Sequence, residues 1–197
     1  MAGSFMARCY SDPMSPRHPV SKIWLVSDAR NDAALERALK HLPRGSGLIF
    51  RHYHLSPPER RARFKQLRRL ARQHGHRLVL SGSAAEARRW GADGAYGADL
   101  SAGGSTLRLV TVHSLRELRR AHRADAVLLS PVFPTRSHPG GKVLGPVRWR
   151  TIAALSPVPV IALGGMTAPR SRRIGAKHWA GIDAFCGKAN PGNSKDS

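Results

Sequence analysis

Short apolar runs alternate with helix-like segments along most of this chain, and no two of these runs are placed to form a hairpin. The predicted strands are Lys22–Ser27, Leu48–Leu55, Arg77–Leu80, Gly91–Gly97, Leu107–Val112, Asp125–Ser130, Val158–Ala162 and a weak eighth near Gly181–Phe185. Apolar residues at helical spacing predict helices over Asp32–Leu42, Pro57–His74, Ala84–Trp90, Ser114–His122 and Leu144–Leu155, with one more after Thr167. This alternation is typical of parallel α/β proteins.

The close spacing of the strands favours a small (β/α)8 TIM-type barrel over a doubly wound sheet, and no Gly-rich dinucleotide fingerprint follows the first strand. The tail from Gly187 is polar without an apolar stripe, so we expect the barrel to lack its last helix. We expect a disordered arm over residues 1–21, the barrel over 22–186 and a flexible tail over 187–197. A missing helix leaves room for a partner chain, and hence for a homo-oligomer.

The charge balance is strongly basic, with 33 Lys and Arg against 12 Asp and Glu and a net charge of +21. The arginines are spread along the chain, which fits a solvated surface and also fits attraction to phosphate or nucleic acid. Aromatic residues make up only 6%, and no strand interleaves aromatic and basic residues, which argues against base stacking. A nucleic-acid-binding module is therefore the weaker alternative.

Cys9 and Cys186 are too few and too far apart for a disulfide framework. The first 22 residues hold three prolines and no apolar core of a signal peptide. No apolar stretch approaches the roughly 20 residues that a membrane span needs. We therefore expect a cytoplasmic protein with no membrane partner.

Two polar loops follow the sixth and seventh predicted strands, at the strand ends where parallel α/β proteins bind ligands. Gly164 and Gly165 would let backbone N–H groups approach a phosphate at the start of the next helix, although two glycines could also serve only a tight turn. Thr135, Ser137 and His138 suit a clamp on a diphosphate or carboxylate, and an ordinary polar loop fits them equally well.

Histidines offer a weaker hypothesis. His52 and His54 would point to one face of the second strand, and His113 and His138 lie near neighbouring strand ends. A metal site is not favoured because no cysteine or carboxylate completes the set. Either His113 or His138 could act as a general acid or base, because an imidazole titrates near neutrality.

The segments VLLSPVFPT, LG and VPVIALGGMT, together with WLVSD, LIFR, GADGAY and VTVHSLREL upstream, resemble the thiamine phosphate synthase/TenI family from Ile23 to Phe185. The resemblance implies a (β/α)8 barrel. Synthase members join a hydroxymethylpyrimidine diphosphate to a thiazole phosphate and release pyrophosphate, with Mg²⁺ as cofactor. TenI-like members act, where active, as thiazole tautomerases.

The resemblance also implies roles for single residues. Arg51 would contact diphosphate, Thr111 stands where the synthase has a serine, and Thr135 matches the first threonine of the loop after strand six. Ser137 replaces a second threonine and His138 the lysine after it. Phosphate-binding residues would then be Thr135, Ser137, Gly164 and Gly165, and the catalytic residues would be Arg51, Thr111 and His138. Gly187 joins the phosphate-binding set from the barrel geometry alone, because barrels commonly bind phosphate between the loops after strands seven and eight.

Three further positions depart from the synthase pattern. Tyr53 stands in place of a lysine, and Ser81 and Gly82 stand in place of an Asn-Asp pair; Asp99 would have to supply the remaining metal carboxylate. Mg²⁺ usually needs one or two carboxylates besides the phosphates. The sequence therefore predicts a retained thiazole-phosphate site beside a degraded magnesium and diphosphate site. The alternatives are a TenI-like tautomerase and a non-catalytic phosphate-ligand binder.

Overall fold

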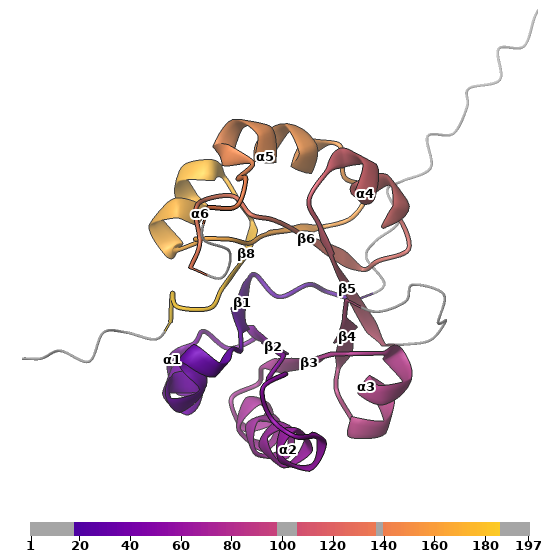
Figure 1. The fold of residues 1–197 in the computed structure, drawn as a ribbon, viewed down its shortest axis with the longest axis vertical. Helices are drawn as coiled ribbons and strands as arrows, with labels where there is room; N and C mark the ends of the chain where they lie inside the picture. The colour runs from indigo at the N-terminus through magenta and orange to yellow at the C-terminus, as the bar shows by residue number, and fades with distance from the viewer. Residues whose placement is uncertain (1–17, 98–105, 137–139, 186–197) are drawn as a thin grey trace, which may run out of the picture.

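The computed structural model describes residues 18–97, 106–136 and 140–185. It contains a closed barrel of eight parallel strands in sequence order, with β1 pairing to β8 to close the ring (Figure 1). The strands are β1 (Ile23–Val26), β2 (Gly47–Phe50), β3 (Arg77–Ser81), β4 (Gly94–Tyr96), β5 (Leu107–Val112), β6 (Ala126–Leu129), β7 (Val160–Ala162) and β8 (His178–Gly181). The predicted TIM-type (β/α)8 fold is confirmed.

Helices surround the barrel on its outside (Figure 1). They are the 3₁₀ helix η1 (Ala29–Ala34), then α1 (Leu35–His41), α2 (Pro57–Gln73), α3 (Ala84–Trp90), α4 (Leu115–Arg120), α5 (Gly145–Ala154) and α6 (Ala168–Ile174). Within the described residues, which end at 185, no helix follows β8. No helix of the described ranges has the length and apolar character to cross a membrane.

The strand predictions were wrong at two places. β2 ends at Phe50 rather than Leu55, because the chain turns at His52, whose φ is +45°. Two predicted side-chain pairs are still neighbours: Arg51 with Tyr53, and His52 with His54. They are brought together by a turn, and not by the alternation of side chains along a strand. β8 starts at His178, earlier than expected.

The first helical segment begins earlier than predicted and starts as a 3₁₀ helix. Asp28, not Asp32, is its N-cap: the Asp28 carboxylate accepts a hydrogen bond from the Arg30 amide, and the Asn31 side chain accepts one from the Asp28 amide. Such a reciprocal capping box satisfies amide groups that a helix end leaves unpaired. Asp32 therefore lies inside η1, where its carboxylate is available to other elements.

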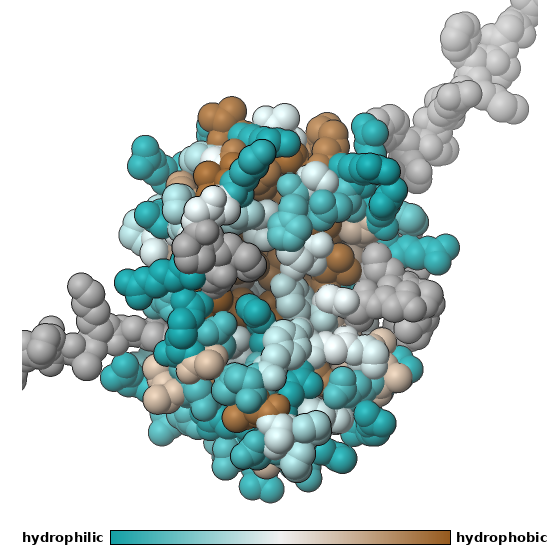
Figure 2. Space-filling model, in the orientation of Figure 1, coloured by the Kyte–Doolittle hydropathy of each residue, from teal (hydrophilic) through white to brown (hydrophobic). Residues whose placement is uncertain are grey.

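Apolar side chains fill the interior of the barrel. Trp24, Ile49, Val79, Leu109 and Leu128 belong to one buried cluster, and two further clusters lie between the strands and the helices. Because the interior is packed, a ligand can bind only at the rim formed by the loops. The outer surface is largely hydrophilic, with apolar side chains gathered over α5 (Figure 2).

Candidate functional site

The predicted site residues that the structure describes lie at the carboxyl ends of four strands. Arg51 follows β2, Thr111 is near the end of β5, Thr135 follows β6, and Gly164 and Gly165 follow β7. The strands are parallel and form one ring, so these ends share one rim of the barrel.

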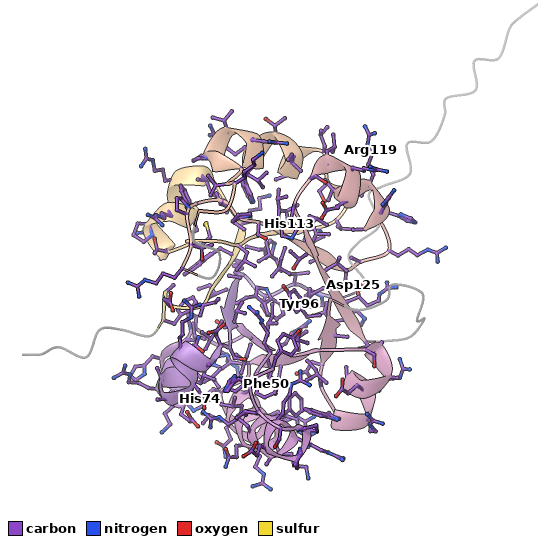
Figure 3. All side chains as sticks on the ribbon, viewed as in Figure 1. Phe50, His74, Tyr96, His113, Arg119 and Asp125 are labelled. Atoms are coloured by element: carbon purple, nitrogen blue, oxygen red, sulfur yellow. The ribbon has the colours of Figure 1, made fainter. Side chains whose placement is uncertain are left out.

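The labelled side chains in Figure 3 show how this rim is arranged. Tyr96 of β4 and His113, just after β5, lie toward the middle of the ring, whereas Arg119 of α4 points outward. Asp99, Ser137, His138 and Gly187, also predicted as site residues, lie outside the described residues. The roles predicted for these four residues therefore stay predictions.

The loops after β6 and β7 are joined backbone to backbone. The Val132 amide donates to the Leu163 carbonyl at 2.9 Å, and the Phe133 amide donates to the Gly164 carbonyl at 3.1 Å. Gly164 has a φ of +95°, and a Cβ atom there would lie 2.6 Å from Cβ of Pro131. Only glycine fits this contact, so the two glycines do more than make a tight turn.

Arg170 adds a positive charge to these joined loops. Its guanidinium donates to the Gly165 carbonyl and lies 4.7 Å over the ring of Phe133, while no carboxylate of the described residues pairs with it. The amide N–H groups of Gly164 and Gly165 donate to no group in the described part of the chain. Free amides beside a guanidinium are groups that can bind an anion, so this part of the rim is a candidate anion-binding surface.

Hydroxyl and imidazole groups lie between this surface and β4. The Thr111 hydroxyl is 2.6 Å from the Tyr96 hydroxyl. His113 is exposed, and its Nδ1 is 2.8 Å from the Ser130 carbonyl oxygen, which can only accept. Nδ1 must therefore carry the proton, which leaves Nε2 of the neutral ring as a base.

On the opposite side of the rim, two of the positions that depart from the synthase pattern, Tyr53 and Ser81, contact each other. The Tyr53 hydroxyl hydrogen-bonds to the Ser81 hydroxyl, although the Tyr53 side chain remains 64% exposed. A lysine and an asparagine at these positions would present polar groups to a ligand. Here the two hydroxyl groups bond to each other.

Arg60 of α2 is a residue that sequence reasoning missed, because its helix carries a row of arginines that predicted a solvated face. Its guanidinium donates to the carbonyls of Arg51 at 2.8 Å and Ser81 at 2.6 Å, and its side chain is only 13% exposed. It also lies 5.3 Å over the ring of Trp90. Arg60 thus joins the loops after β2 and β3.

Magnesium does not fit the carboxylates that the structure describes here. Each candidate faces an arginine: Asp28 faces Arg30 at 2.9 Å, Asp32 faces Arg63 at 2.8 Å, and Glu86 faces Arg60 at 3.7 Å. Within residues 18–97, 106–136 and 140–185, no three His, Cys, Asp or Glu side chains are grouped to hold a metal ion.

Acid should weaken the fold in two stages. Burial lowers the pKa of His52 and His76 below the usual 6.5, against the raising effect of hydrogen bonds to Asp32 and to the Leu39 carbonyl. Burial raises the pKa of Asp32, but hydrogen bonds from His52 and Arg63 outweigh it and lower the pKa below 3.8.

The unfolded chain then takes up protons before the native chain does, so unfolding becomes easier as the pH falls. The loss of stability that is due to the histidines begins below about pH 6.5, and the loss that is due to the carboxylate begins below about pH 4. Thermal melts across pH 3–8 check this, at roughly one-unit steps. His76→Gln should flatten the histidine stage, and a Tm constant between about pH 7 and 5 would contradict the assignment.

Comparison with known proteins points to one family. A family model described as thiamine monophosphate synthase matches residues 23–185. A thiamine-phosphate synthase of Geobacillus thermodenitrificans (strain NG80-2) is 27% identical over 210 residues, covering 94% of this chain and 92% of that protein. A relative in Aquifex aeolicus (strain VF5) is 35% identical over 80 residues, which span 38% of this chain and 43% of that protein.

Solved structures agree on the architecture. Thiamine phosphate pyrophosphorylase from Pyrococcus furiosus matches with a TM-score of 0.68 at 22% identity, covering 85% of this chain and 88% of that one. FabK from Thermotoga maritima matches with a TM-score of 0.62 at 19% identity, covering 84% of this chain and 61% of that one. At such low identity these likenesses support the barrel fold alone.

Proposed function

The chain belongs to the thiamine monophosphate synthase family, and from that premise we propose that it acts in thiamine biosynthesis on a phosphorylated thiazole. The thiazole phosphate binds where the loops after β6 and β7 are joined. The observation that supports this proposal is that the amides of Gly164 and Gly165 have no partner in the described part of the chain while the Arg170 guanidinium lies beside them. Thr135 of the β6 loop lies on the same rim.

The second substrate, a pyrimidine diphosphate, would meet a weaker site. Arg51 remains as a fixed cation after β2, but Tyr53 and Ser81 bond to each other and the nearby carboxylates face arginines. Removing one group that stabilises developing charge costs about 10²–10³ in rate. We therefore propose that the transferase reaction of the family is slow in this protein, while binding of the thiazole phosphate is retained.

One experiment separates binding from catalysis. The protein is titrated with thiazole phosphate by calorimetry, then incubated with thiazole phosphate, pyrimidine diphosphate and Mg²⁺ while thiamine phosphate is measured. We expect measurable binding and a rate at least about 10²-fold below that of the Geobacillus relative as reference. A comparable rate would overturn the degraded diphosphate site, and absence of thiazole-phosphate binding would overturn the proposal itself.

His113 favours a second candidate, a TenI-like tautomerase. Its Nδ1 is fixed on the Ser130 carbonyl, so Nε2 can take a proton from a bound thiazole. Such an enzyme would move a proton within the ring and would need no metal. Incubation with the non-aromatic thiazole tautomer distinguishes this tautomerase from a protein that only binds thiazole phosphate. The tautomerase forms the aromatic ring, whereas the binding protein leaves the tautomer unchanged.

A further inference from the structure

We propose that His52 is a positioning residue for Arg51, which it holds through the hydroxyl of Ser27. Nothing in the family resemblance assigns a role to His52. The proposal rests on the proposed function in one respect: Arg51 is the group that meets the diphosphate of the second substrate.

The backbone at His52 is unusual. Its φ of +45° is the one positive value at a non-glycine residue in the described ranges, and the side chain is almost fully buried, with the residue 1% exposed. Such a conformation costs about 1–3 kcal/mol and persists only where surrounding contacts impose it. Strained residues of this kind gather at binding sites.

The contacts that impose it engage both ring nitrogens. Nδ1 lies 2.8 Å from the Ser27 hydroxyl, and Nε2 lies 2.7 Å from the Asp32 carboxylate. The ring stacks on Phe50 with centroids 4.6 Å apart and planes 6° from parallel. With both nitrogens occupied, His52 can serve neither as a metal ligand nor as a base toward substrate, which excludes the metal hypothesis for this residue.

The direction of each hydrogen bond follows from its donors. The Asp32 carboxylate can only accept, so Nε2 carries the ring proton and donates to it. Nδ1 of the neutral ring then accepts from the Ser27 hydroxyl, whose oxygen in turn accepts from the Arg51 amide at 2.8 Å. The neutral Nε2–H tautomer satisfies every group in this chain, and burial of the ring favours the neutral form.

The far end of the chain is anchored on α2. Arg63 donates to the Asp32 carboxylate and, at 3.0 Å, to the Asp32 carbonyl, and it also pairs with Glu36. The other titratable side chain against the His52 ring is that of His54, with ring centroids 5.1 Å apart. The hydrogen-bonded chain thus links β1, η1, the loop after β2, and α2.

Arg51 is held on both sides of its backbone as a result. Its amide is bonded to Ser27, and its carbonyl accepts from Arg60 at 2.8 Å. Its guanidinium extends toward Tyr53, 5.7 Å from the ring centroid. His52 itself does not face the ligand side, so any effect of His52 on an anion must pass through Arg51.

A double-mutant cycle with inorganic pyrophosphate tests this dependence. Affinity is measured by calorimetry for the wild type, His52→Leu, Arg51→Gln and the double variant. We expect His52→Leu to weaken binding about tenfold in the wild type and by less than about twofold beside Arg51→Gln, since coupled residues are non-additive. His52→Asn should restore part of the affinity, because asparagine tolerates this backbone region. Equal losses in both backgrounds would overturn the proposal.

A readout without ligand completes the test. Amide hydrogen exchange at Arg51 should become about tenfold faster in His52→Leu, because the Ser27 acceptor is no longer fixed. His54→Leu, which removes the exposed neighbouring imidazole, should leave that exchange unchanged. If the wild type binds no pyrophosphate, Arg51 does not bind the diphosphate. The rate of amide hydrogen exchange at Arg51 then decides by itself whether His52 positions this residue. Unchanged exchange in His52→Leu would overturn the proposal.

Discussion

A valine in place of Gly164 should lower the Tm by roughly 5–20 °C and abolish binding of thiazole phosphate. At a φ of +95° a β-branched residue is strained, and its Cβ would lie 2.6 Å and 2.7 Å from Cβ and Cα of Pro131. Neither atom belongs to the flexible end of a side chain, so the β6 and β7 loops would have to separate. Strain and overpacking together should cost about 2–6 kcal/mol.

Gly45 provides the matched control for this experiment. It has a φ of +82°, but no atom lies within 4 Å of the position that a Cβ would occupy. Gly45→Val therefore carries the backbone strain without the collision and lies in the loop before β2, away from the rim. If thermal melts and calorimetry gave the same Tm and the same affinity for both variants, the contact between the two loops would not be what holds the phosphate site.

The fold could be predicted because its signal is local and repeated. Leu107–Val112 and Ala84–Trp90 have the predicted bounds, since each is a short apolar or periodic run between clear breakers. The errors arose where side chains far apart in the sequence decide the backbone. β2 stops at Phe50 because His52 turns inward to bonds with Ser27 and Asp32, which are 25 and 20 residues away.

The sequence singled out the glycines of the candidate site, but it did not single out the arginines that α2 contributes. Gly164 and Gly165 stand out in sequence because the residue type itself has the backbone property that the loop needs. Arg60 and Arg63 look like the exposed Arg61 and Arg69, because helical spacing does not reveal which guanidinium meets a carbonyl or a carboxylate. Only the packing of α2 against the strand ends distinguishes them.

The changes at Tyr53 and Ser81 were predicted as separate losses, yet in the structure they form one contact. Arg60 lies beside that contact, 5.4 Å from the Tyr53 ring centroid and bonded to the Ser81 carbonyl. The Tyr53 and Ser81 hydroxyls therefore satisfy each other, and Arg60 satisfies the Ser81 carbonyl. Polar groups bonded in this way are more stable than the same groups left unpaired.

Replacing Arg60 by alanine should destabilise this arrangement and the Arg51 loop with it. The carbonyls of Arg51 and Ser81 would lose a charged donor, and the rings of Phe50 and Trp90 would lose the side chain that covers them. Hydrogen bonds to charged groups contribute about 1.5–3 kcal/mol each, so we expect a loss of about 2–4 kcal/mol, because paired contacts are not additive. The Tm should fall by roughly 5–15 °C.

Lysine at position 60 should recover little of this stability, because one ammonium cannot reach both carbonyls with the geometry of a planar guanidinium. Arg61→Ala is the matched control, since it removes the same charge from the next, exposed position of α2 and should change the Tm by less than about 2 °C. Pyrophosphate affinity should fall only in the Arg60 variants, because only they release the Arg51 carbonyl. If Arg60→Ala and Arg61→Ala had the same Tm and the same pyrophosphate affinity, Arg60 would be a solvated surface residue, as its position in the helix suggested.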